Sequence, residues 1–140
     1  MTLLPIVLST VLALLAAAHA WWAMGRIWPS TSEPELARAV IGDGRIRMPA
    51  PWQCAAVAIV LAIVAIWPWL IMNWPGSELV FIGSLVIGAV FFIRGTAGYS
   101  ARWRARFTAE PFRTRDFYLY SPLCLALGVG FIALLTREMR

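Results

Sequence analysis

Residues 48–77 read MPAPWQCAAVAIVLAIVAIWPWLIMNWPGS, a stretch with no acidic or basic side chain. A helix needs about 20 apolar residues to cross the hydrocarbon core of a bilayer, and this run supplies them before the turn-forming Asn73-Trp74-Pro75-Gly76. Three more runs lack charged side chains, namely residues 1–25 apart from His19, residues 79–93 and residues 117–136. A water-soluble fold of 140 residues has no use for four such runs, so the pattern indicates an integral membrane protein.

From these runs we predict an all-α fold, an integral membrane four-helix bundle in a single transmembrane domain over residues 1–140. The spans are expected at about 3–25, 52–72, 77–98 and 118–136. The first run also imitates a secretion signal, because Ala18-His19-Ala20 fits a cleavage site, but no basic residue precedes it. We therefore interpret the first run as a span that is retained.

Two alternatives remain for the start of the fourth span. Ser121-Pro122 is a hydroxyl cap followed by proline, which favours a helix that begins there. Such a helix, ending near Thr136, reaches only about 22 Å at 1.5 Å per residue, which is slightly short for a bilayer. In the other alternative the chain is already helical from Asp116 and bends at Pro122.

Both long connections are predicted to carry amphipathic segments that lie at the membrane interface. In the first, Ser32-Glu33-Pro34-Glu35 is typical of a helix start, and an apolar stripe follows it. In the second, Trp103 and Phe107 are four residues apart, so their rings are expected to enter the interface together. The side chains assigned to lipid headgroups are Arg94, Arg102, Arg104 and Arg106. For Arg94, one turn inside the third span, a buried functional cation is the alternative.

The arginines predict an orientation. Four lie in the first connection and six in the third, counting Arg94, whereas only Arg137 and Arg140 lie on the other side with the terminal amine. The positive-inside rule therefore places both long connections in the cytoplasm and both termini outside. Because these arginines lie between apolar runs, the net charge of +5 does not indicate nucleic-acid binding.

The chain resembles a bacterial family of small four-span inner-membrane proteins known only as a domain of unknown function. The first similar element is His-x-x-Trp-x-x-Gly, present as His19, Trp22 and Gly25, and Trp28-Pro29 follows it. The most specific element is Tyr-Ser-Pro-Leu-Cys-Leu at residues 120–125. The resemblance covers most of the chain, implies four spans in a bacterial inner membrane, and implies no activity.

The only histidine, His19, is expected about two turns from the cytoplasmic end of the first span. An ionisable group at that depth normally needs a partner, and Asp116, Tyr118, Tyr120 and Ser121 approach the membrane from the same side. We therefore predict a polar cluster or ligand site formed by His19, Trp22, Trp28, Asp116, Tyr120 and Ser121. One interpretation is acid/base or ligand-binding chemistry; the other is a hydrogen-bonded histidine that fixes helix packing.

Three small residues, Ser84, Gly88 and Gly95, follow one side of the third span and are assigned to helix packing, with a dimer seam as the alternative. One histidine and two cysteines lack the spacing of a zinc site, so we predict no metal and no cofactor. Cys54 and Cys124 start two spans on the same side and are interpreted as buried small apolar side chains.

No catalytic residue can be assigned, and the sequence therefore favours a non-enzymatic accessory protein or a binder of lipid or another apolar molecule. The first alternative is a membrane-embedded enzyme that acts on a lipid or isoprenoid, with His19 supported by Asp116 or Tyr120. The second is a dimeric transporter or channel, which the lack of an acid within the predicted spans disfavours. The expected partners are membrane lipids, a larger membrane complex or a second copy of the chain.

Overall fold

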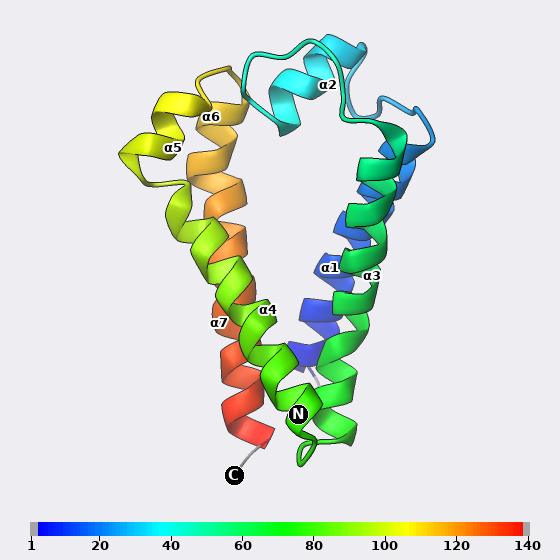
Figure 1. Cartoon of the computed structure of the whole chain (residues 1–140), viewed down its shortest axis with the longest axis vertical. Coiled ribbons are helices and arrows are strands. Elements are labelled where there is room, and N and C mark those ends of the chain that lie inside the picture. The colour runs from blue at the N-terminus through cyan, green and yellow to red at the C-terminus, as the bar shows by residue number, and fades with distance from the viewer. Residues whose placement is uncertain (1–2, 139–140) are drawn as a thin grey trace.

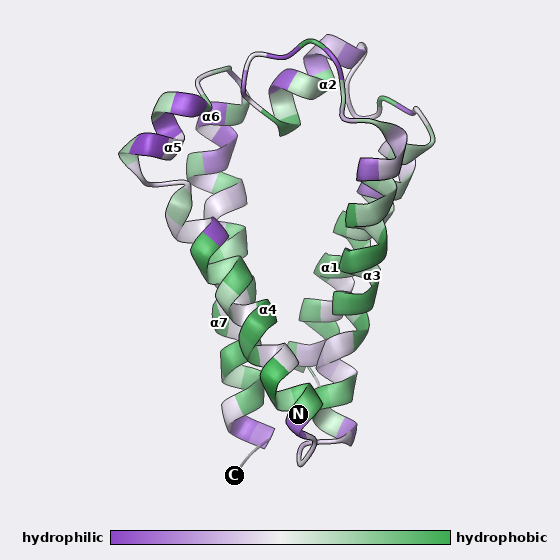
Figure 2. Cartoon of the chain, viewed as in Figure 1, coloured by the Kyte–Doolittle hydropathy of each residue, from purple (hydrophilic) through white to green (hydrophobic). Residues whose placement is uncertain are grey.

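The computed structural model describes residues 3–138, and over this range the chain is helical with no strand. Four helices are long and apolar enough to cross a membrane, which confirms the predicted fold class. Figure 1 shows how they are arranged, and Figure 2 shows that their middle parts are apolar. The elements are α1 (Leu3–Ala23), α2 (Glu33–Val40), α3 (Pro51–Asn73), α4 (Glu78–Ala97), α5 (Ala101–Arg106), α6 (Phe112–Arg115), the π-helical turn η1 (Asp116–Tyr120) and α7 (Ser121–Glu138).

The four long helices form two pairs, α1 with α3 and α4 with α7, and the helices of each pair pack along their length. The pairs meet where the chain begins and ends and diverge toward α2 (Figure 1). We call these two ends of the molecule the terminal end and the α2 end. The core that joins the pairs lies toward the terminal end and contains Leu8, Leu12, Ala65, Ile71, Val80, Leu127, Phe131, Leu134 and Leu135.

The predicted turn between the second and third spans is confirmed. The backbone N–H of Ser77 donates to the Trp74 carbonyl at 3.1 Å, and the Ser77 hydroxyl accepts from the Val80 N–H at 3.4 Å. Glu78 then occupies the first turn of α4, where the helix dipole favours an acid. The hairpin therefore places α3 and α4 antiparallel, with their turn at the terminal end (Figure 1).

The fourth span follows the alternative in which the chain is already helical at Asp116, and it begins earlier still. Its helical path starts at Phe112, passes through η1 and continues as α7. Pro122 has no N–H, and in a regular helix its ring would clash with the carbonyl four residues before it. The wider turn avoids that conflict: the N–H of Ser121 donates to the carbonyl of Asp116, five residues back. Asp116 therefore lies inside the fourth helical path.

The two long connections are helical, but their apolar side chains pack on the protein. In α2, Leu36 and Ala37 are fully buried. In the second connection, the Trp103 ring lies against Phe107, with 4.2 Å between centroids, and Phe107 packs on Phe112 at 5.8 Å. These two rings cover the polar start of the fourth helix while staying partly exposed, and their entry into the lipid interface stays a prediction. Arg140 and the terminal amine, which entered the orientation argument, lie outside the described residues.

Candidate functional site

The α2 helix is fastened to the α4/α7 pair. The Tyr120 hydroxyl donates to the carbonyl of Ala39 at 3.1 Å, and the N–H of Ala109 donates to the carbonyl of Gly42 at 3.1 Å. Gly42 ends the helical segment with a φ of +77°, a left-handed conformation that favours glycine. It also lies so close to Phe112 that a side chain there would overlap the ring. These contacts fix α2 on the start of the fourth helix.

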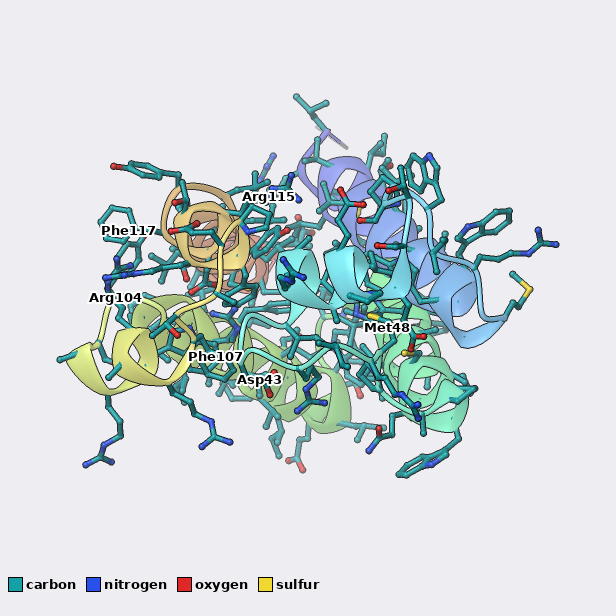
Figure 3. All side chains as sticks on the ribbon, turned by 90° about the horizontal axis from the view of Figure 1, so that it is seen from above. Asp43, Met48, Arg104, Phe107, Arg115 and Phe117 are labelled. Carbon is teal, nitrogen blue, oxygen red and sulfur yellow. The ribbon has the colours of Figure 1, made fainter. Side chains whose placement is uncertain are left out.

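Hydrogen bonds also hold the segments that connect α2 to the α1/α3 pair. The carboxylate of Glu33, at the start of α2, accepts a hydrogen bond from the N–H of Met48 at 2.9 Å. On the preceding connection, the Trp22 indole donates to the carbonyl of Trp28 at 2.9 Å. The α2 helix therefore bridges the open end between the two pairs, as Figure 1 shows from the side and Figure 3 from above.

Two acids of the first connection are ionised more readily than usual. A hydrogen bond from the Arg45 side chain holds the pKa of the Asp43 carboxyl below its ordinary value. Hydrogen bonds from the backbone and hydroxyl of Thr31 lower the pKa of Glu35. Both groups therefore carry negative charge near neutral pH beside the arginines of this end.

Beneath α2 lies a pocket of about 160 Å³ against the α1/α3 pair. The end of α2 contributes Val40, and the adjoining residue Ile41 completes that wall. The remaining walls are mostly apolar and come from the α1/α3 pair and the segment before α3: His19, Trp22, Met48, Pro49, Gln53, Cys54 and Val57.

His19 supplies the chemistry of this pocket. Its Nδ1 lies 2.8 Å from the carbonyl oxygen of Leu15, which can only accept, so Nδ1 carries the proton. The Trp22 ring lies edge-on to the imidazole, 4.9 Å between centroids. None of residues 3–138 makes a hydrogen bond to Nε2. In the neutral ring Nε2 is therefore an acceptor available to a bound molecule.

A second polar cluster lies on the α4/α7 pair. Arg94 donates to Asp116 Oδ1 at 2.6 Å, and the Trp103 indole donates to Asp116 Oδ2 at 2.9 Å. The Arg94 guanidinium also lies over the Trp103 ring, 4.4 Å from its centroid, and reaches the Ser121 hydroxyl at 3.5 Å. Because Asp116 is only 2% exposed, these donors supply the hydrogen bonds that its carboxylate loses with water.

This cluster connects α5, α4 and the π-helical turn. Gly98 makes the close approach possible, because a Cβ at that position would overlap the Ser121 hydroxyl. Both carboxylate oxygens of Asp116 are engaged within the cluster, so Asp116 is not available as a base for His19. The arrangement is a hydrogen-bonded ion pair that fixes packing, and Arg94 gains a partner that the sequence analysis did not assign to it.

The structure thus places the residues of the predicted polar cluster in three separate groups: the His19 pocket, the Asp116 ion pair and the contact between Tyr120 and α2. His19, Trp22 and Trp28 belong to the α1/α3 pair and its connection. Asp116 and Ser121 belong to the α4/α7 pair with Arg94, and Tyr120 holds α2. Sequence reasoning missed Met48, Gln53 and Val57 at the pocket, because apolar and amide side chains before or within a span give no distinctive signal.

The remaining residues predicted from the sequence are the arginines assigned to lipid headgroups and the small residues assigned to helix packing. Arg102 and Arg106 are exposed on α5, whereas Arg104 lies over the Phe117 ring at 4.9 Å. Ser84, Gly88 and Gly95 are all buried on α4. Gly88 faces Ile132 and Gly95 faces Leu125 on α7, while the Ser84 hydroxyl accepts from the Trp67 indole of α3 at 3.1 Å.

The two cysteines are free and lie on different pairs, Cys54 on α3 and Cys124 on α7. Within residues 3–138, no group of three or more histidine, cysteine or acidic side chains is placed to hold a metal ion.

Comparison with protein families identifies a relationship for most of the chain. A family model described as protein of unknown function (DUF3995) matches residues 12–131. No curated protein and no solved structure matches the chain.

Proposed function

The chain belongs to the DUF3995 family of proteins of unknown function, and we propose that it is a non-enzymatic membrane protein that binds a lipid-like molecule at the His19 pocket. The observation that carries the proposal is that His19, whose Nε2 has no hydrogen-bond partner among residues 3–138, lines a mostly apolar pocket beneath α2. A histidine that only fixed packing would be enclosed by its neighbours, whereas this one borders a space of about 160 Å³.

The size of the pocket limits what enters it. Water occupies about 30 Å³ per molecule in the liquid, and drug-sized ligands fill pockets of about 300–1,000 Å³. The pocket therefore accepts only the polar end of a larger molecule. The rest of that molecule would lie outside the pocket.

The chemistry of the pocket selects the polar end. Because Nδ1 donates to Leu15, the neutral His19 ring offers an acceptor at Nε2, and a hydroxyl is the complementary group. Trp22 and Val57 provide apolar contacts beside that acceptor. We therefore propose a long-chain or isoprenoid alcohol, or a lipid with a free hydroxyl, as the class of ligand.

A photoreactive test uses two probes, a long-chain alcohol that carries a diazirine and its O-methyl ether, which lacks the donor. In the purified full-length protein, the alcohol should label peptides containing His19 or Cys54 about fivefold more than the ether does, since one hydrogen bond contributes about 1 kcal/mol. His19→Phe keeps a ring and should remove the preference. Thr10→Ala, on an exposed face of α1, should retain it.

Two results would count against the proposal. Equal labelling of wild type and His19→Phe by the alcohol would mean that the acceptor plays no part. Labelling spread over the outward faces of the four helices, with no enrichment at the pocket, would mean that the probe reports only lipid contact.

The enzymatic alternative receives less support from the geometry. It required Asp116 or Tyr120 beside His19, but Asp116 is engaged by Arg94 and Trp103, and Tyr120 donates to α2. Transport receives less support as well, because Leu12 and Phe131 are fully buried in the core that joins the pairs. An ion or solute that crossed within a single chain would have to pass through that core, so transport would require a path between two copies.

We further propose that the α2 end faces the cytoplasm of a bacterial cell and that the protein lies in the inner membrane. Arg26, Arg38, Arg45, Arg47 and the arginines of α5 and α6 all lie at that end, as the positive-inside rule requires. Reporter fusions at each terminus test this orientation, and a cytoplasmic C-terminus would contradict it. A larger complex or a homodimer remains a prediction from the sequence.

A further inference from the structure

A second pocket, of about 190 Å³, lies on the α4/α7 pair between α5 and the start of the fourth helix. Its lining differs from that of the His19 pocket, because most of the side chains carry charged or hydroxyl groups. The lining consists of Arg104, Glu110, Arg113, Thr114, Phe117 and Tyr118.

Two guanidinium groups dominate the charge of this pocket. Arg104 lies over the Phe117 ring at 4.9 Å, a contact that holds the long side chain in one orientation. Neither Arg104 nor Arg113 forms an ion pair with an acid of residues 3–138, in contrast to Arg94 and Arg45.

One acid is present and reduces this charge. Glu110 lines the pocket, and its Oε2 accepts a hydrogen bond from the N–H of Thr114 at 3.2 Å. The two arginines and one glutamate leave a formal charge of +1. A monoanion therefore neutralises the pocket, whereas an anion of higher charge would leave an excess.

The position of the pocket brings it within reach of the membrane surface. Tyr118 is 75% exposed and Leu119 is 55% exposed, so the helix beside the pocket presents large apolar side chains at the surface. Figure 3 places Arg104 and Phe117 at the outer edge of the α2 end, on the side away from Met48. Figure 2 shows hydrophilic segments at this level and apolar helix below it, the order of groups in a lipid leaflet.

We propose that this pocket binds the phosphodiester of an anionic membrane phospholipid. A phosphodiester carries one negative charge, and guanidinium groups bind phosphate oxygens through paired N–H donors. The hydroxyls of Thr114 and Tyr118 supply further donors at the rim. The acyl chains then lie along the exposed surface below Tyr118. The site is separate from the His19 pocket, and neither proposal depends on the other.

Native mass spectrometry of the full chain in a neutral detergent tests the site, with phosphatidylglycerol and phosphatidylcholine as probes. Wild type should bind one phosphatidylglycerol at least tenfold more tightly than phosphatidylcholine, whose choline cation opposes the two arginines. Arg104→Gln/Arg113→Gln should remove this preference. Arg102→Gln/Arg106→Gln is the matched control, because it removes the same charge from exposed positions outside the pocket, and it should keep most of the preference.

A lysine variant and a competition experiment with soluble phosphates complete the test. Arg104→Lys/Arg113→Lys retains both charges but lacks the paired, planar N–H donors of the guanidinium group, so it should bind phosphatidylglycerol with intermediate affinity. If the glutamine variant does not fold, the lysine variant replaces it in the comparison. Inorganic phosphate and glycerol 1-phosphate, added at millimolar concentration, should displace the lipid poorly.

Three results would overturn the proposal. An equal loss in the two glutamine variants would show that total surface charge, and not this pocket, attracts the lipid. Wild-type affinity in the lysine variant would show that the guanidinium forks are not used. Displacement by free phosphate as effective as by lipid would assign the pocket to a soluble anion.

Discussion

The ion pair of Arg94 and Asp116 should respond unequally to the loss of its two partners. Asp116 has a side chain only 3% exposed, whereas the Arg94 side chain is 30% exposed. When Asp116→Asn removes the acid, the guanidinium can extend toward water or lipid phosphates. When Arg94→Met removes the cation, the carboxylate stays buried with Trp103 as its remaining strong donor.

The magnitudes follow from that difference. Removing one partner of a buried pair costs about 3–5 kcal/mol when the other charge cannot reach solvent, and we expect Arg94→Met near the lower end of that range. Asp116→Asn should cost about 1 kcal/mol, because the amide still accepts from Trp103 and Arg94 relaxes outward. The double variant should cost about as much as Asp116→Asn alone, which corresponds to a coupling of about 3 kcal/mol, the full cost of Arg94→Met.

The assay is reversible unfolding of the protein in mixed micelles by a denaturing detergent, followed by the helical circular dichroism signal. Arg45→Met provides the matched control, because the Arg45–Asp43 pair has the same 2.6 Å separation but lies on an exposed connection. Its loss should change the free energy of unfolding by less than about 1 kcal/mol.

The reasoning fails if Asp116→Asn destabilises the protein as much as Arg94→Met does. It also fails if the costs of the two single variants add in the double variant, because additivity means that the groups do not interact. A large effect of Arg45→Met would indicate that burial does not decide the cost.

Two further predictions concern the contacts that hold α2 against the start of the fourth helix. Gly42→Ala should destabilise the protein more than Gly44→Ala. At both positions an alanine at positive φ costs about 1–2 kcal/mol. At position 42 the added methyl group would also overlap the Phe112 ring, which adds about 1–3 kcal/mol. Equal costs in the same unfolding assay would contradict this. Tyr120→Phe loses its hydrogen bond to α2, about 1 kcal/mol, so maleimide labelling of the buried Cys54 beneath α2 should accelerate about fivefold. An unchanged labelling rate would show that α2 does not control access to the pocket.

The spans could be predicted from the sequence because the bilayer imposes a strong condition on composition. Charge-free runs near 20 residues mark spans regardless of how the helices pack, and all four expected spans lie within a few residues of helices α1, α3, α4 and α7. The start of the fourth span stayed open between two alternatives because Ser121-Pro122 looks like a helix cap, and the structure follows the alternative in which the chain is already helical at Asp116. The π-helical turn that lets a helix continue through this position depends on backbone hydrogen bonding, which the residue pattern does not reveal.

The division into two pairs could not be predicted in the same way. In a membrane, the apolar side chains that face lipid and those that face another helix have similar composition, so periodicity does not identify partners. Only the small residues of α4, such as Gly88 and Gly95, marked a packing face. The residues of the predicted cluster around His19 lie at a similar depth in the membrane, but depth alone does not make residues on different helices neighbours. The structure places them on both helix pairs.

The placement of α2 links the pocket on the α1/α3 pair to the α4/α7 pair. The chain connects α2 to α1 and α3, yet α2 also accepts a hydrogen bond from Tyr120, and Gly42 just after it packs on Phe112, both at the start of the fourth helix. For the ligand that we propose, a polar end that fits beneath Val40 would leave those contacts intact, whereas a headgroup that displaced α2 would break the hydrogen bond from Tyr120 to Ala39. We therefore expect this hydrogen bond to limit the size of the polar group that binds beside His19.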